Sequence, residues 1–179
     1  MIHLKGKRIN LRSFKKSDAE SLCENIKPKI IKRYTANIPH PYNLKHAIIF
    51  IKKSKLRERK KEEYSLGIEL KETKKIIGGI SLMKIDLKNK NAELGYWLGK
   101  NYWGRGLTTE AVGLMLDFAF NKMKLNSVYA RVFEENKGSS KVLIKSGFKQ
   151  EGVQRQRFYR FGRWHHMPQY SILKHEYKK

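Results

Sequence analysis

The pattern of apolar and polar positions along this 179-residue chain switches repeatedly between the spacing of strands and that of helices. Residues 2–14 alternate loosely around Gly6 and predict an opening strand or hairpin. Runs rich in β-branched and aromatic residues predict further strands at 64–70, 75–85, 93–98, 127–133, 149–159 and 164–173. Apolar spacing and capping signals predict helices at 17–26, 29–35, 44–61, 111–123 and 138–146. This order predicts an α+β fold with one mixed sheet.

Local signals place several boundaries within this pattern. Ser17-Asp-Ala-Glu20 has the spacing of a capping box, and Pro28 is expected to end the helix that follows. Asn43 can cap the next helix after the turn at 37–43. The apolar stripe of that helix is expected to consist of Leu44, Ala47, Ile48 and Ile51. Gly78-Gly79 predicts a bulge or a close approach of another chain segment.

The length fits a single domain spanning residues 1–179, with room for a full hydrophobic core. There is no internal repeat, linker or low-complexity segment. No apolar run reaches 18 residues, and the start of the chain lacks the apolar region of a secretory signal. The single cysteine, Cys23, cannot form an internal disulfide and is interpreted as a small core residue. A cytoplasmic location is the expectation.

Charge is the unusual feature of the composition. Forty Lys and Arg residues against sixteen Asp and Glu residues give a formal net charge of +24. Such a field attracts polyanions. A lysine-rich proteome and a surface for RNA or the ribosome explain this excess equally well. The basic run 52–61 carries no interleaved aromatic residues, so it is interpreted first as a solvated helix face.

Candidate chemistry begins at Asn101-Tyr-Trp-Gly104-Arg-Gly106-Leu-Thr-Thr-Glu-Ala111. This stretch follows the predicted strand at 93–98 and precedes a nearly all-apolar helix. Two glycines at a strand-to-helix turn let the backbone approach a ligand and direct its N–H groups outward. Together with the positive end of the helix dipole, they predict an anion site, most naturally for phosphate.

The stretch resembles the acyl-CoA-binding loop of the GNAT family of N-acetyltransferases, whose pattern is Gln/Arg-x-x-Gly-x-Gly/Ala. A second motif of the RimJ/RimL-type ribosomal-protein N-terminal acetyltransferases, Asn-x-x-Ser…Gly-Phe, matches Asn136, Ser139, Gly147 and Phe148. The resemblance implies the GNAT fold: a twisted, mostly antiparallel sheet with helices on both faces and a splay between the family's fourth and fifth strands. It also implies an acetyl-CoA-dependent transfer to an amine. No metal is expected, because no Cys, His or Asp spacing in the chain is typical of a metal site.

The resemblance further implies which residues hold acetyl-CoA. The splayed strand edge would bind the pantetheine arm through the backbone of Tyr96, Trp97 and Leu98. The pyrophosphate would lie on the N–H groups of Gly104, Arg105, Gly106, Leu107 and Thr108. Asn136 would bind the pantetheine arm, and Lys141 would meet phosphate. Asn101 replaces the usual first Gln or Arg, which removes one side-chain contact but leaves the backbone cradle.

The chemistry needs a group that accepts a proton from the amine and one that protonates the departing thiolate. Glu93 is the candidate base, because its apolar neighbours would favour a more basic carboxylate. A structural salt bridge, or attack by an amine already neutral in solution, are the alternatives. Relatives with an acid on the strand after Gly-Phe have it where this chain has Phe158, and many place a tyrosine where it has Leu143. Ser139 is therefore the candidate acid; the alternative is a plain helix-start serine.

The sequence does not identify the amine that accepts the acetyl group. The first hypothesis is a protein N-terminal α-amine, and the second is a polyamine, an aminoglycoside or another small amine. The third is a CoA-binding, ribosome- or RNA-associated module without turnover. The stretch 155–164 mixes arginines with aromatic residues and borders the expected acceptor groove. His165 and His166 are adjacent on a predicted strand and make poor joint metal ligands. The resemblance also allows a homodimer, since homodimers are common among relatives.

Overall fold

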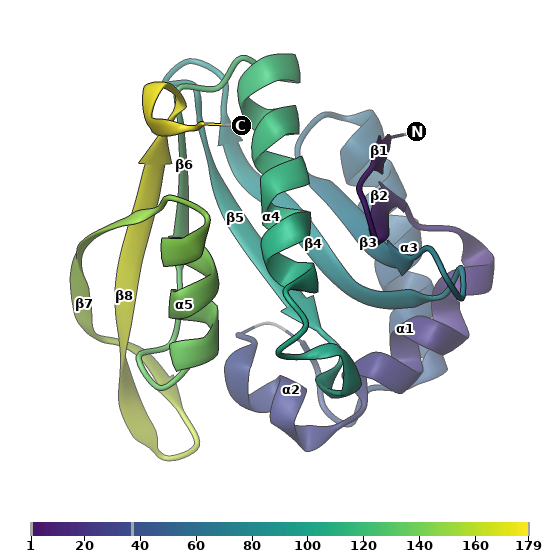
Figure 1. Ribbon diagram of the computed structural model, residues 1–179. Helices are drawn as coiled ribbons and strands as arrows, with labels where there is room; N and C mark the ends of the chain where they lie inside the picture. The colour runs from purple at the N-terminus through teal and green to yellow at the C-terminus, as the bar shows by residue number, and fades with distance from the viewer. Residues whose placement is uncertain (1, 37, 179) are drawn as a thin grey trace.

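A computed structural model describes residues 2–36 and 38–178, and Figure 1 shows them as one twisted sheet with helices on both faces. The sheet has eight strands in the order β1-β2-β3-β4-β5-β6-β8-β7. Their bounds are β1 (His3–Lys5), β2 (Ile9–Ser13), β3 (Tyr64–Leu70), β4 (Ile76–Asp86), β5 (Asn91–Leu98), β6 (Ser127–Arg131), β7 (Lys149–Arg160) and β8 (Arg163–Leu173). Neighbouring strands are antiparallel except β5 and β6, which are parallel. The predicted α+β architecture is confirmed.

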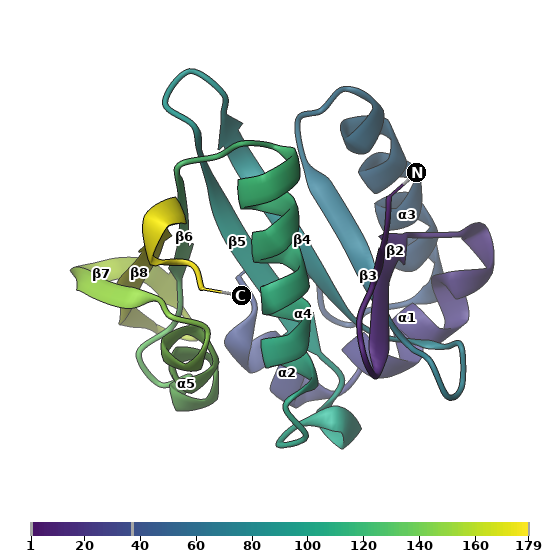
Figure 2. The same cartoon turned by 45° about the horizontal axis from the view of Figure 1, so that its top comes forward.

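The helices lie on the two faces of this sheet, as Figures 1 and 2 show from two directions. Their bounds are α1 (Ala19–Ile26), α2 (Lys29–Tyr34), α3 (Leu44–Arg59), α4 (Leu107–Asp117) and α5 (Lys137–Lys145). The π-helical turn Phe118–Lys122 extends α4, so the predicted apolar helix is confirmed and begins earlier than expected. No helix among the described residues is long and apolar enough to cross a membrane.

Two buried clusters hold the layers together. The larger fills the space between the sheet and α4, where Ala111, Val112 and Met115 are fully buried against strand residues such as Leu94. The smaller lies on the opposite face and joins α1 and α3 to the sheet through residues such as Leu22 and Ile51. Apolar burial on both faces fixes the position of the central strands, which carry the site.

The structure corrects two local predictions. The carboxylate of Asp18 hydrogen-bonds the N–H of Lys15 and the guanidinium of Arg12, and α1 begins after Asp18 without the predicted Ser17–Glu20 capping box. In α3 the expected stripe is half right: Ala47 and Ile51 are buried as predicted, but Leu44 and Ile48 are 45% and 42% exposed. Ser54 is buried on the same side as Ala47 and Ile51. The small side chains at 47 and 54 let this side of α3 pack close to its neighbours. Asn43 does cap α3, since its side chain accepts a hydrogen bond from the N–H of His46.

The sheet splits in its centre, between β5 and β6. The two strands pair only from Asn91↔Ser127 to Glu93↔Tyr129. Beyond that point β5 continues along β4, whereas β6 continues along β8. The strands therefore diverge (Figure 1), and residues 94–98 have no strand partner on the side that faces β6. The splay that the resemblance implied is present between β5 and β6.

Candidate active site

A cavity of about 1240 Å³ occupies the split in the sheet. On the α4 side its lining includes Gly104, Thr108 and Ser139, and on the opposite side it includes His46 and Lys53 of α3. The cavity therefore connects both faces of the sheet through the gap between β5 and β6. Gly79 faces the ring of Trp97 here, and a Cβ at Gly79 would lie 2.7 Å from the indole Nε1. The predicted close approach at Gly78-Gly79 is confirmed.

The glycine-rich loop forms the end of this cavity next to α4. Gly104 and Gly106 have φ of +74° and +72°, a backbone region that residues with a side chain rarely adopt. Gly106 is the N-cap of α4 and has no side chain that could accept from the N–H groups of the first turn. The side chain of Leu107 lies in the core, so only its backbone can serve a ligand. The loop has the geometry of an anion site at a helix N-terminus.

Arg8, which the sequence did not reveal as part of the site, braces this loop from the turn before β2. Its Nη1 donates to the carbonyl of Arg105 at 2.7 Å, and its Nε donates to Glu110 Oε2 at 3.0 Å. Burial alone would raise the pKa of Glu110, but the hydrogen bonds from Arg8 and Ile9 outweigh burial and lower this pKa. Arg8 and Glu110 are about a hundred residues apart, so only the fold shows their pairing.

Trp103 fixes the other end of the loop. Its indole Nε1 donates to the carbonyl of Leu98 at 2.7 Å, and its ring lies 6.3 Å from that of Tyr34. The Leu98 carbonyl is thus engaged at the end of β5. The backbone groups of Leu94 to Trp97 on the edge facing β6 are the ones left for an extended ligand.

Tyr96 brings a side chain to the site, beyond the backbone role expected of it. Its hydroxyl lies 2.9 Å from Ser139 Oγ and donates to the Ser139 carbonyl at 3.1 Å. Burial raises the pKa of Tyr96, more than the hydrogen bond to Ser139 lowers it. The phenol is therefore held in its protonated form, and the two hydroxyls form a hydrogen-bonded pair in the cavity.

The start of α5 positions Ser139 within that pair. Asn136 is the N-cap, and its Oδ1 accepts from the N–H of Ser139 at 3.1 Å. Ser139 is therefore not the cap itself. Asn136 and Lys137 line the cavity, whereas Lys141 is exposed on α5 outside the lining.

Glu93 lies at the point where β5 and β6 separate, and it is 9% exposed. Its Oε1 accepts from Arg131 Nε at 3.1 Å, and its Oε2 accepts from Arg131 Nη2 and lies 2.9 Å from Lys84 Nζ. Two cations therefore hold this carboxylate in place. The side chain of Arg131 is 20% exposed and that of Lys84 is 57% exposed, so Arg131 is the fixed partner and Lys84 the more solvated one.

The hairpin of β7 and β8 closes one side of the cavity. Arg157, Phe158 and Met167 line it, and the Phe158 ring packs edge-on against Phe133 at 5.3 Å. The tip of the hairpin contacts α2, because Arg160 donates to the carbonyl of Thr35. The structure thus places the predicted basic and aromatic stretch beside the cavity.

The adjacent histidines of β8 bind separate partners. His165 Nδ1 lies 2.9 Å from Glu135 Oε1, while His166 Nδ1 accepts from the N–H of Gln156 at 3.3 Å. Within residues 2–36 and 38–178, no three His, Cys, Asp or Glu side chains gather as a metal site would require.

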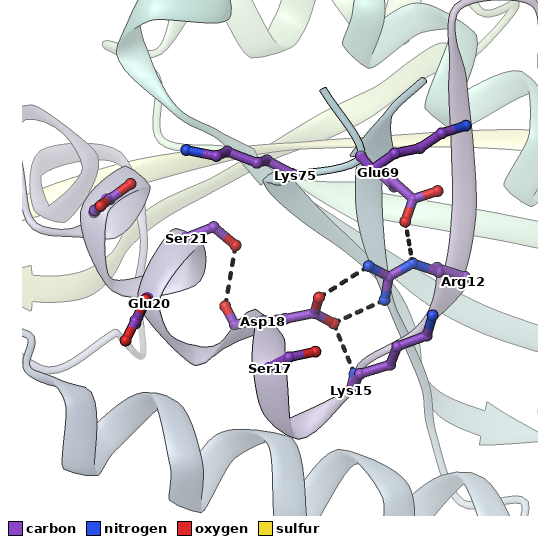
Figure 3. A pocket seen from close by; sticks show the side chains of 10 residues that line it. Arg12, Lys15, Ser17, Asp18, Glu20, Ser21, Glu69 and Lys75 are labelled. Carbon is purple, nitrogen blue, oxygen red and sulfur yellow. Dashed lines mark hydrogen bonds and ion pairs between the residues drawn. The ribbon is translucent and has the colours of Figure 1, made fainter. Parts of the chain in front are cut away.

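A second cavity, of about 490 Å³, lies beside α1 (Figure 3). Arg12 lies at its centre and donates to both oxygens of Asp18 at 2.7 and 2.9 Å and to Glu69. The hydrogen bonds to Asp18 raise the pKa of Arg12, and those from Arg12 and Asn10 lower the pKa of Glu69 against the effect of burial. Arg12, Asp18 and Glu69 satisfy one another, so this cluster joins β2, β3 and α1 as a structural network.

Comparisons with known proteins agree with the geometry. Residues 8–149 match the family model described as "Acetyltransferase (GNAT) domain". The chain is 33% identical over 170 residues to p20 of Bacillus licheniformis, an uncharacterized N-acetyltransferase, with 95% of each chain covered. This protein therefore belongs to the GNAT family and is an N-acetyltransferase.

Two relatives that match little more than half of this chain carry names with different acceptors. YdaF of Bacillus subtilis, whose name marks it as a candidate ribosomal N-acetyltransferase, is 36% identical over 103 residues, which are 58% of this chain and 56% of YdaF. The spermidine N(1)-acetyltransferase of Escherichia coli is 29% identical over 100 residues, 56% of this chain and 54% of that enzyme.

One solved structure that superposes on this chain contains bound acetyl-CoA. The microcin C7 self-immunity acetyltransferase MccE, in complex with acetyl-CoA and AMP, superposes with a TM-score of 0.85 at 27% identity, covering 93% of each chain. The residues of the present chain fit acetyl-CoA: they provide an unpaired strand edge, a glycine loop at a helix N-terminus and a cavity that joins the two.

Proposed function

We propose that this protein transfers the acetyl group of acetyl-CoA to a protein N-terminal α-amine, as a ribosomal-protein type of acetyltransferase. The observation that carries this proposal is the cavity that passes through the split sheet, because it lets a thioester and an amine meet from opposite faces. The amine nitrogen attacks the thioester carbonyl carbon, the C–S bond breaks, and an amide forms. Starting from the ammonium form, the nitrogen loses two protons, one before it attacks and one from the tetrahedral adduct. The departing sulfur gains one proton, and the other leaves to solvent.

Substrate binding follows from the backbone. The backbone N–H and carbonyl of Tyr96 on the free edge of β5 would bind the pantetheine arm as a strand would, while the backbone groups of Trp97 point toward β4. The N–H groups from Gly104 to Thr108 would hold the pyrophosphate. An edge N–H of β5 close to the thioester carbonyl would also stabilise the oxyanion that develops during attack. Arg8 contributes by fixing the loop through the carbonyl of Arg105.

Ser139 is the proposed proton donor to the thiolate, and Tyr96 supports it. The 2.9 Å contact between their hydroxyls lets Tyr96 turn its proton from the Ser139 carbonyl to Ser139 Oγ as Ser139 gives one up. The phenolate then regains a proton from solvent. The raised pKa of Tyr96 keeps this second donor protonated at neutral pH.

Glu93 is the proposed acceptor of the amine proton. Its Oε2 already binds one ammonium group, that of Lys84, and this lysine is 57% exposed. The ammonium group of a substrate would displace Lys84, while Arg131 keeps the carboxylate in place. We expect the Glu93→Gln variant to lose activity mainly at neutral pH and to recover part of it at high pH, where free amine is available.

The first experiment measures acetyl transfer by mass spectrometry. The panel holds short peptides that begin with Ser, Ala, Thr, Asp or Met, together with spermidine and an aminoglycoside. Acetylation of a peptide α-amine is the expected result. Acetylation of the small amines alone would overturn the proposed acceptor but leave the acetyltransferase chemistry. The Glu93→Gln variant is then assayed against pH, and an unchanged profile would remove Glu93 from the role of base.

A further inference from the structure

The half of the cavity opposite α4 lies beneath α3 and is rich in charge. We call it the acceptor groove. From α3 it is lined by Lys53 and Arg57, and from the strands by Lys84, Glu93 and Arg131. Lys53 and Arg57 lie four residues apart and so project from the same side of the helix. The groove thus has a basic helix above it and an ion-paired sheet below.

The cations and carboxylates that line the whole cavity are unequal in number. The cations are Lys53, Arg57, Lys84, Arg131, Lys137 and Arg157, and the carboxylates are Glu63, Glu93 and Glu135.

Each of these carboxylates already has a cationic partner. Glu63 pairs with Arg57 at 2.9 Å, and Glu93 pairs with Arg131 and Lys84. Glu135 pairs with Arg163 at 2.8 Å. Carboxylates near the ammonium groups beyond the reacting one would favour a polyamine, and the described lining offers none that is unpaired.

Three lining cations, by contrast, have no carboxylate partner within the described residues: Lys53 on α3, Lys137 on α5 and Arg157 on β7. All three are exposed, and Lys137 lies next to Ser139, on the α4 side of the cavity, so Lys53 and Arg157 are the ones considered for the acceptor. Charges of one sign in a groove raise the local concentration of ligands of the other sign and disfavour ligands of the same sign. Salt screens this effect beyond about 10 Å, so the acceptor's own charges must lie within a few residues of its reacting amine.

We infer that the acceptor is an acidic polypeptide N-terminus, with Asp or Glu side chains among the residues that directly follow the acetylated one. This inference rests on the proposed function and specifies its substrate class. The reacting amine reaches Glu93, while carboxylates further along the peptide bind Lys53 and Arg157. A polyamine would place additional ammonium groups next to these unpaired cations.

Three peptides of equal length test this inference. All begin with Ser, and positions 2–4 carry Asp and Glu in the first, Asn and Gln in the second, and Lys and Arg in the third. The measured quantity is kcat/KM for acetyl transfer at low and at moderate salt. We expect the acidic peptide to exceed the neutral one by about tenfold at low salt, with the basic peptide lowest, and the differences to shrink as salt is added.

A charge-reversed pair of variants locates the effect. Lys53→Glu with Arg157→Glu is expected to abolish or reverse the order of the peptides. The matched control, Lys122→Glu with Lys145→Glu, changes net charge equally at exposed lysines outside the cavity lining and should keep the order. Thermal unfolding and acetyl-CoA binding verify that both variants are folded.

The outcomes separate the two proposals. Equal transfer to the acidic and neutral peptides would overturn the inference and leave the proposed function intact. The same loss of preference in the control would also overturn it, because net charge and not the groove would then select the acceptor. Transfer to spermidine with none to any peptide would overturn the proposed function itself.

Discussion

Single side chains at the site act through neighbours that are distant in the sequence. Ser139 and Tyr96 are 43 residues apart, and Glu93 and Arg131 are 38 residues apart. Each pair joins β5 to a segment across the split in the sheet. The chemistry therefore depends on how accurately the two sides of the split are held.

The hydroxyl pair leads to a prediction at this scale. Ser139→Ala is expected to lower kcat about 100-fold, the low end of the contribution of a general acid, with little change in KM for acetyl-CoA. Tyr96→Phe should lower kcat by about tenfold, since it removes only the second donor. Steady-state kinetics measure both. Equal rates for Tyr96→Phe and the wild type would show that the phenol has no part in proton transfer.

An ion pair between Arg8 and Glu110 joins α4 to the turn before β2. Glu110 links the first turn of α4 to Arg8, and its side chain is 16% exposed. Because the pKa of Glu110 is lower in the folded protein, its stabilising effect is complete above about pH 4.5 and is lost as pH falls through the folded-state value.

Glu110→Gln tests this link. We expect the free energy of unfolding to be lower in the variant at neutral pH, and the difference from the wild type to diminish below about pH 4.5. Urea denaturation of the variant and the wild type at a series of pH values measures this difference. A difference independent of pH would mean that the carboxylate charge does not contribute. We also expect weaker binding of acetyl-CoA, because the loop loses its brace.

The network around Arg12 joins three elements on the other side of the molecule. Arg12→Met leaves Asp18 and Glu69 buried without their cation, so we expect a loss of about 3–5 kcal/mol in the free energy of unfolding. Arg57→Met is the control, because the Arg57 side chain is 49% exposed and its pair with Glu63 should contribute less than about 1 kcal/mol. Chemical denaturation measures the loss of unfolding free energy in both variants, and similar losses would contradict the structural role of the buried network.

The whole molecule carries a formal net charge of +24. Repulsion among like charges opposes the compact state, and salt screens that repulsion. We therefore expect the melting temperature to rise when salt is added from low concentration to about 0.15 M, as differential scanning fluorimetry can measure. A fall would show that favourable ion pairs outweigh the general repulsion. The same field would speed the approach of acidic partners, while the groove selects among them.

The sequence by itself determined the order of the elements, the glycine-rich loop before α4 and the family resemblance. These features depend on local spacing: alternation in strands, apolar periodicity in helices, and glycines where positive φ is needed. It misplaced part of the buried side of α3, because Ser54 carries no apolar signal, whereas the exposed Leu44 and Ile48 do.

Only the tertiary structure decided how residues far apart in the chain meet. It showed the divergence of β5 from β6, the contact of Tyr96 with Ser139, the brace from Arg8 and the pairing of Glu93 with Arg131 and Lys84. Pairings of this kind depend on which surfaces the core brings together. The sequence does not show whether a lysine or a glutamate is solvated, ion-paired or free to bind a substrate. That depends on the side chains that the fold places next to it.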